Sequence, residues 1–184
     1  MKFKIVLLLA LFISISASAQ KYTNTKTEKI TKEWNGLTFS SEKSLFSNIE
    51  NADHFSKAAP LFKDMPLSEG SMVTAFVMVN SSFSSLTEED QEALFSDTWK
   101  SYLTYHFIPG RVDSNSLEKA VENGNGTAYF KTILGQRIGV KREGGAIVLF
   151  DTHGNTAKII AADFYHKHGF FHVIDGFITP SNEQ

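Results

Sequence analysis

The chain has 184 residues, and its 18 basic and 20 acidic side chains give a formal charge of −2, which argues against a nucleic-acid-binding protein because those carry a basic face. Cysteine is absent, which excludes disulfides, thiolate nucleophiles, cysteine zinc sites and the lipidated cysteine of a lipoprotein signal. A fold of this length must rely on its hydrophobic core, and one domain is enough.

Residues 1–19 have the features of a cleaved secretory signal. Lys2 and Lys4 form a positive head, Ile5–Ile15 is an apolar stretch too short to span a bilayer, and Ala17-Ser18-Ala19 is a typical cleavage site. The alternative, a retained anchor, needs about twenty apolar residues, and serines interrupt this run. Cleavage removes two lysines and no acids, leaving 16 basic and 20 acidic residues, a charge of −4. The sequence therefore predicts a secreted, periplasmic or cell-envelope protein with no integral membrane segment in the mature chain.

Residues 20–33 are polar and rich in threonine and lysine, which is typical of an extended spacer. We expect one folded unit over residues 34–184. Helical spacing of apolar side chains, with Ser44 as a cap, predicts one or two short helices between residues 45 and 62. The β-branched run Ser71–Val79 predicts a central strand that ends in a turn.

Three further helices are predicted by caps, first-turn acids and apolar faces. They are expected at Glu88–Phe95, at Thr98–Phe107 and at Ser116–Glu122. After them the pattern changes to strands separated by glycine-containing turns, at Thr127–Ile133, Arg137–Lys141, Ala146–Phe150, Ala157–Ala162 and Phe170–Ile178. Helices first and strands last favour an α+β fold, an antiparallel β-sandwich or partial barrel with several short helices packed on it.

Several segments carry a resemblance to a known family, in order and at its spacing. They are Thr38–His54, Thr74–Phe83, Tyr102–Gly110, Leu134–Ile138 and Ala161–Pro180. Together they resemble the fasciclin domain family, over roughly Leu37 to Pro180. The chain departs from the family pattern at Val77-Met78-Val79, where alanine-proline-threonine is usual, and at His168, where asparagine normally precedes the glycine. The first departure suggests that an exposed edge near Met78 has a different partner.

The resemblance implies adhesion or extracellular-matrix recognition, without a shared enzymatic activity and without a cofactor. The family's tyrosine-histidine segment has been implicated in cell binding, which singles out Tyr105 and His106. His106, however, shares a helical face with Trp99 and Leu103. A buried imidazole bonded to a polar group such as Asn80 would brace helix against strand, and we favour that role.

The C-terminal motif places His172 and Asp175 in an apolar run. They are three positions apart, so in a regular strand they point to opposite faces and cannot form a catalytic couple. We expect Asp175 to accept backbone hydrogen bonds at the turn before Gly176, and His172 to satisfy a buried partner. With Asn80 and Phe83, these residues form the predicted structural motif.

Two alternatives to a binding module remain open. His166, His168 and His172 offer three imidazoles within seven residues to a divalent metal, although Gly169 interrupts the strand and an exposed turn is the default interpretation. A hydrolase would need serine, histidine and aspartate gathered in one pocket, and the sequence has no Gly-x-Ser-x-Gly elbow.

The sequence therefore predicts a non-catalytic adhesion or binding module that recognises a protein or glycan. Surface aromatic and methionine side chains contribute most at interfaces. The predicted contact residues are Tyr105, His106, Tyr165 and Phe170, with Met78 if the altered turn is exposed.

Overall fold

The computed structural model describes residues 28–65, 67, 70–94 and 99–181. The predicted signal and most of the predicted spacer lie outside this part of the chain. Within it the helices are short and precede β5, and none is long and apolar enough to cross a membrane. They are α1 (Leu45–Ile49), η1 (Asp53–Phe55, a 3₁₀ helix), α2 (Ala59–Phe62), η2 (Asn80–Ser85, a 3₁₀ helix), α3 (Glu88–Leu94), α4 (Trp99–Tyr105) and α5 (Ser114–Asn123).

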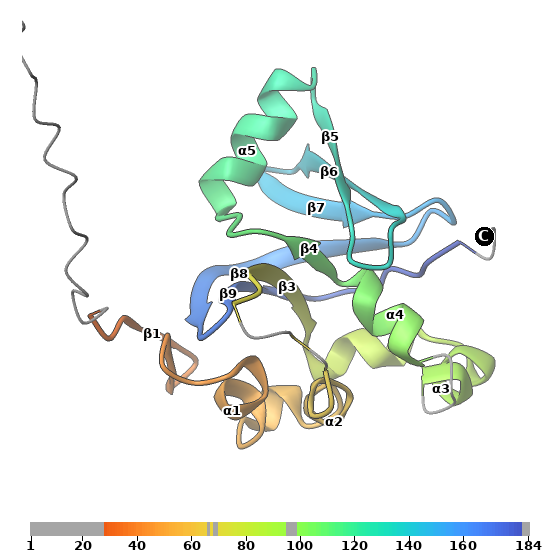
Figure 1. Ribbon diagram of the computed structural model, residues 1–184. Helices are drawn as coiled ribbons and strands as arrows, with labels where there is room; N and C mark the ends of the chain where they lie inside the picture. The colour runs from red at the N-terminus through yellow and green to blue at the C-terminus, as the bar shows by residue number, and fades with distance from the viewer. Residues whose placement is uncertain (1–27, 66, 68–69, 95–98, 182–184) are drawn as a thin grey trace, which may run out of the picture.

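The strands form a two-stranded hairpin and a seven-stranded sheet (Figure 1). The hairpin pairs β1 (Thr31–Trp34) with β2 (Leu37–Ser40). The large sheet has the order β4-β3-β9-β8-β7-β6-β5, with strands β3 (Val73–Met78), β4 (Phe107–Pro109), β5 (Thr127–Lys131), β6 (Arg137–Glu143), β7 (Ala146–Phe150), β8 (Thr156–His166) and β9 (Gly169–Ile174). Its neighbouring strands are antiparallel, except that β3 and β9 run parallel.

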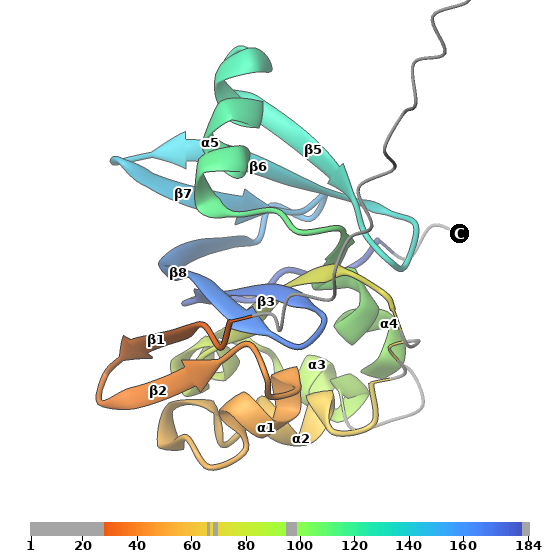
Figure 2. The same ribbon diagram turned by 60° about the vertical axis from the view of Figure 1, so that its left-hand side comes forward.

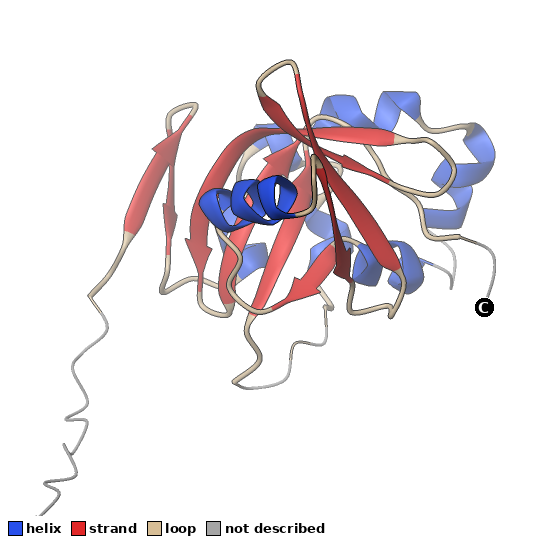
Figure 3. Ribbon diagram, turned by 90° about the horizontal axis from the view of Figure 1, so that it is seen from above, coloured by secondary structure: helices blue, strands red, loops and turns tan. Residues whose placement is uncertain are grey.

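The sheet curls until its two edge strands approach one another (Figure 3). Just after β5, the amide of Ile133 donates to the carbonyl of Phe107 in β4 at 2.8 Å, and that of Leu134 donates to Thr104 at 3.4 Å. The first bond satisfies a carbonyl on the edge strand β4, which would otherwise be unpaired, and the second joins the same segment to α4. The predicted α+β class and partial barrel are confirmed, and the parallel pair is the departure from an all-antiparallel sheet.

The core lies between the sheet and two groups of helices. In Figures 1 and 2, α1 to α4 gather on one side of β3, whereas α5 lies against β5 and β6. The N-terminal hairpin adds Phe39, whose ring centroid lies 4.9 Å from Phe164 and 5.3 Å from Phe171. Such aromatic contacts add to the free energy gained by burial.

Most of the predicted elements are present, with different ends. Ser44 caps α1 as expected, its hydroxyl accepting from the amide of Ser47 at 3.0 Å. The helix predicted to reach Phe107 instead ends at Tyr105, because residues 107–109 pair with β3 as an edge strand. Strand β1 begins at Thr31, inside the stretch expected to be a spacer, and Lys32 Nζ donates to the carbonyl of Ala162 at 2.7 Å.

Candidate functional site

Tyr105 lies in the core, where its residue is 1% exposed. Its hydroxyl donates to the carbonyl of Arg137 at 2.9 Å, which ties α4 to β6. Burial, with a smaller contribution from the Asp151 carboxylate, raises the pKa of Tyr105 to about 12. The phenol therefore stays a protonated donor and does not form part of the surface.

His106 is completely buried beside it. Its Nδ1 lies 2.8 Å from the carbonyl oxygen of Tyr102. A carbonyl only accepts, so Nδ1 carries the proton and Nε2 has a free lone pair, for which the described residues offer no donor. Desolvation lowers the pKa of His106 to about 4, so the ring is neutral at pH 7.

The prediction that His106 forms a hydrogen bond with a polar group such as Asn80 was wrong for Asn80. The side chain of Asn80 donates to the carbonyl of Asp53 at 2.7 Å and to Ser56 Oγ at 2.9 Å, and accepts from the amide of Lys57 at 2.9 Å. All its hydrogen bonds thus go to the segment around η1, because η2 begins at Asn80 and turns the side chain toward that segment. His106 packs instead against Phe177, at 5.0 Å between ring centroids.

His172 and Asp175 both form hydrogen bonds with the backbone of neighbouring segments. His172 Nε2 lies 2.9 Å from the carbonyl of Val112, and its Nδ1 accepts from the amide of Asp163 at 3.2 Å. Asp175 accepts from the amide of Lys158 at 2.9 Å. A Cβ on Gly176 would lie 2.2 Å from the carbonyl oxygen of Thr156, so only glycine fits there.

The histidines proposed as metal ligands are engaged with the fold. His166 Nε2 lies 3.2 Å from the carbonyl of Phe170, and its Nδ1 accepts from the amide of His168 at 3.2 Å. Both ring nitrogens of His166 and of His172 are therefore occupied. No group of three metal-ligating side chains occurs among the described residues.

The remaining predicted contact residues differ in exposure. Met78 is 1% exposed and Phe83 4% exposed, so the turn after β3 does not present Met78 to solvent. Tyr165 and Phe170 are half-buried on paired strands, with ring centroids 4.8 Å apart. Of the predicted contact residues, this pair is the one accessible from outside.

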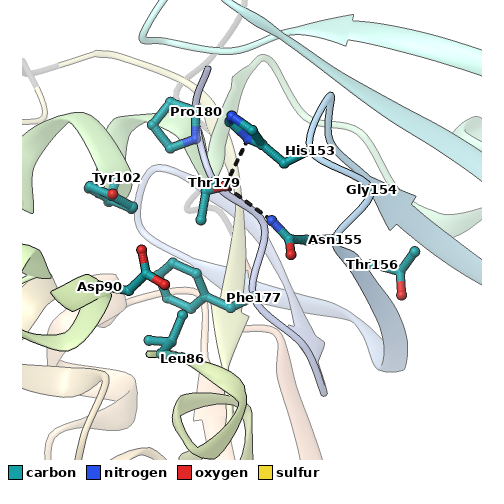
Figure 4. Close-up of a pocket in the computed structure, with 10 residues that line it drawn as sticks. All are labelled: Leu86, Asp90, Tyr102, His153, Gly154, Asn155, Thr156, Phe177, Thr179 and Pro180. Atoms are coloured by element: carbon teal, nitrogen blue, oxygen red, sulfur yellow. Dashed lines mark hydrogen bonds between the residues drawn. The ribbon is translucent and has the colours of Figure 1, made fainter. Parts of the chain in front are cut away.

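Sequence reasoning did not find a pocket of about 530 Å³ that the described residues form. Figure 4 shows Asp90 and Tyr102 on one side, the turn between β7 and β8 on the other, and the segment after β9 between them. The lining residues are Leu86, Asp90, Tyr102, His153, Gly154, Asn155, Thr156, Phe177, Thr179 and Pro180. They come from four separate segments, and no local motif relates them.

The turn that forms one wall is held by the buried carboxylate of Asp151. Its Oδ1 accepts from the amides of His153 and Asn155, both at 2.9 Å. Its Oδ2 accepts from the amide of Thr179 at 2.7 Å and from the side-chain amide of Asn155 at 2.8 Å. One carboxylate thus fixes the turn relative to the C-terminal segment.

The pocket wall combines aromatic surface with polar groups. Burial, followed by the carboxylates of Asp90 and Glu89, raises the pKa of Tyr102, so its hydroxyl remains a donor. Asp90 Oδ2 accepts from Thr87 Oγ1 at 2.7 Å, which caps α3. His153 Nδ1 lies 3.2 Å from Thr179 Oγ1.

The fasciclin domain model matches residues 47–180, which is most of the chain. This chain belongs to the fasciclin domain family. It is 29% identical over 128 residues to protein sll1483 of Synechocystis sp., covering 67% of this chain and 63% of that relative. The chain thus spans less than two thirds of the length of the curated relative it matches.

A solved fasciclin structure has the same fold. It is the FAS1 domain pair from the insect cell adhesion molecule Fasciclin I, with a TM-score of 0.61 at 16% identity over 81% of this chain and 66% of that one. Membership of the family indicates a module for adhesion or binding. At this identity, the structural likeness carries the fold alone.

Proposed function

We propose that this chain is an exported, non-catalytic binding module that attaches to a glycan on a cell surface or in a matrix. In this proposal residues 1–19 direct export and are removed, residues 20–33 are a spacer, and residues 34–184 act as one unit. Membership of the fasciclin family supports a role in adhesion.

The pocket shown in Figure 4 is the observation that favours a glycan partner over a protein partner. Its volume of about 530 Å³ lies within the range of small-ligand sites. A sugar ring has apolar C–H faces and polar edges. Tyr102, which is half-buried, supplies aromatic surface for the first, and Asp90, His153 and Asn155 supply hydrogen-bonding groups for the second.

The arrangement of Thr179 and His153 supports binding rather than hydrolysis. A hydroxyl next to an imidazole is the start of a nucleophilic triad, in which a carboxylate orients the imidazole. Here the Asp151 carboxylate accepts from the Thr179 hydroxyl itself, at 3.2 Å, and from the backbone amide of His153. The carboxylate therefore competes with the imidazole for the hydroxyl proton.

A glycan array probed with the chain lacking residues 1–19 tests this function, with Tyr102→Ala as the pocket variant. We expect the wild type to bind a subset of glycans, and the variant to lose at least about tenfold in affinity. Tyr165→Ala serves as the matched control, and it also tests the half-buried Tyr165–Phe170 pair. If the wild type binds no glycan, or if only Tyr165→Ala weakens binding, the pocket is not the site.

A panel of esterase and glycosidase substrates tests the absence of catalysis. We expect no turnover above the blank. Turnover that disappears in Thr179→Val would overturn the non-catalytic assignment.

A further inference from the structure

The solvent-facing side of β5, β6 and β7 carries an aromatic row that crosses three strands. Tyr129 lies opposite Gly139, and Gly139 lies opposite Phe150. Directly opposed residues share one face of a sheet. Tyr129 is 62% exposed, whereas its neighbours along β5, Ala128 and Phe130, pack against the core.

Gly139 shapes this row. A Cβ at this position would lie 2.2 Å from the ring of Phe150, so the ring rests directly on the β6 backbone. The Tyr129 ring meets Phe150 edge-on, with centroids 5.9 Å apart and an interplanar angle of 75°. The result is a hollow of about 360 Å³, whose wall includes Arg137.

The same face carries cations on both sides of the row. Lys131 lies opposite Arg137 on one side, and Lys141 and Lys158 both lie opposite Val148 on the other. Lys141 forms an ion pair with Glu143 at 2.7 Å, and its Nζ lies 5.9 Å from the Phe150 ring centroid.

Part of this positive charge is not neutralised. Lys131, Arg137 and Lys158 are exposed, and within the described part of the chain their side chains make no ion pair. The Asp175 carboxylate near Lys158 accepts from the backbone of that lysine. A chain whose formal charge is −2 thus has one sheet face on which cations exceed acids.

We propose that this basic–aromatic face, defined by Tyr129, Phe150, Lys131, Arg137, Lys141 and Lys158, binds an acidic polysaccharide. The inference rests on the proposed function and names the chemistry of the partner. Sugar C–H faces stack on Tyr129 and Phe150, and the guanidinium of Arg137 pairs with carboxylates in the planar, two-bonded geometry that arginine favours.

The arrangement of cations and rings on this face distinguishes an acidic polysaccharide from a nucleic acid and from a protein. A nucleic acid carries a phosphate on every nucleotide and is met by a dense basic surface, whereas the cations here are separated by the aromatic row. A protein partner requires an apolar centre that excludes water, whereas here the two rings lie between exposed cations. A uronate polymer, with one carboxylate per charged sugar, supplies both the C–H faces and the separate anionic groups that this arrangement would bind.

The basic–aromatic face also adjoins the pocket. Thr152 borders the hollow beside Phe150, and His153, the next residue, borders the pocket. An extended polymer that follows the turn between β7 and β8 meets both surfaces.

The test measures binding of the chain without residues 1–19 to immobilised polygalacturonate, dextran and an oligothymidylate by biolayer interferometry. Lys131→Glu/Arg137→Glu removes the charge, and Tyr129→Ala removes the stacking ring. Lys57→Glu/Lys63→Glu changes the net charge by the same amount at exposed turn positions on either side of α2, and it is the matched control.

We expect the wild type to bind polygalacturonate more tightly than dextran, with affinity falling as salt rises. The double variant and Tyr129→Ala should each lose about tenfold or more, and the control should match the wild type. The inference would be overturned if the control lost as much affinity as the face variants, or if the face variants bound as tightly as the wild type. It would also be overturned if the wild type bound oligothymidylate more tightly than polygalacturonate, or did not bind polygalacturonate. The glycan array and Tyr102→Ala judge the proposed function separately, so either can fail alone.

Discussion

Single polar side chains in this core act by joining elements that are distant in sequence. The Tyr105 hydroxyl links α4 to β6, and His172 links β9 to the segment before α5. A buried donor or acceptor left without a partner costs more than its hydrogen bond contributes. Each such residue therefore fixes the position of its partner, although none of them contacts solvent.

Tyr105→Phe tests this role, because it removes the hydroxyl and leaves the ring. The carbonyl of Arg137 then loses its donor, and we expect the free energy of unfolding to fall by about 1 kcal/mol in urea denaturation. Tyr129→Phe removes a hydroxyl from an exposed ring and should change the free energy of unfolding by less than about 0.5 kcal/mol. Equal effects of the two substitutions would contradict the assignment.

For single residues, burial is easier to predict from the sequence than the identity of the hydrogen-bonding or packing partner. The helical face shared by His106, Trp99 and Leu103 was enough to expect a bracing imidazole. Its hydrogen bond to Tyr102 is local, four residues back along the chain. Its packing partner Phe177, however, belongs to the segment after β9, which follows α4 by about seventy residues. Distance along the chain therefore hid the partner.

Among the elements, the parallel pair of β3 and β9 organises the centre of the sheet. Every residue of β3 is buried, and all but one of β9. At the start of the pair, Gly169 has a φ of +138° and faces the backbone of Val73. The close approach is possible because glycine has no Cβ.

Gly169→Ala should open this end of the sheet. The new Cβ would lie 2.1 Å from the carbonyl oxygen of Val73, so a strand must shift in addition to the strain of the positive φ. We expect a loss of about 3 kcal/mol or more in chemical denaturation. Gly135 has a φ of +97°, and a Cβ added there would meet no atom within 4 Å. Gly135→Ala therefore controls for backbone strain alone and should lower the free energy of unfolding by about 1 kcal/mol.

The turn between β7 and β8 is the element on which the candidate site depends. Asp151→Ala removes the acceptor for amides of His153, Asn155 and Thr179. We expect a loss of about 2 kcal/mol in thermal or urea unfolding, together with weaker glycan binding by the folded variant. Asp113→Ala removes the cap of α5, a helix that contributes none of the pocket's lining residues, and should destabilise the fold without changing the affinity of the folded protein.

Elements with a local signal were predictable, and elements made by distant pairing were not. Ser44 and Asp113 cap helices through side chains three residues from the amides they bind, and this spacing is visible in the sequence. Residues 107–109 carry the same apolar pattern as the end of a helix, and pairing with β3 decides their structure. The pocket gathers α3, α4 and two later segments, so only the fold brings its residues together.

Over the whole molecule, three buried imidazoles link stability to pH. Burial lowers the pKa of His106 and of His166 to about 4, and it lowers that of His172. In the unfolded chain a histidine titrates near pH 6.5. Between about pH 4 and pH 6.5 the unfolded state therefore binds more protons than the folded state, and the free energy of unfolding rises with pH.

The protein should accordingly be most stable above pH 6.5 and lose stability steadily as the pH falls toward 4. His106 and His166 each contribute up to about 1.4 kcal/mol per pH unit in that window, and His172 contributes in the same direction. His106→Gln keeps a donor for the Tyr102 carbonyl but cannot be protonated, so the slope of unfolding free energy against pH should fall by about one proton. Urea titrations at intervals from pH 7.5 to pH 4.5 measure this slope. His54→Gln, which replaces an exposed imidazole, is the control. Because the slope is compared within each variant, any packing defect that His106→Gln introduces at all pH values cancels. An unchanged slope in His106→Gln would mean that this imidazole is not the neutral brace the structure describes.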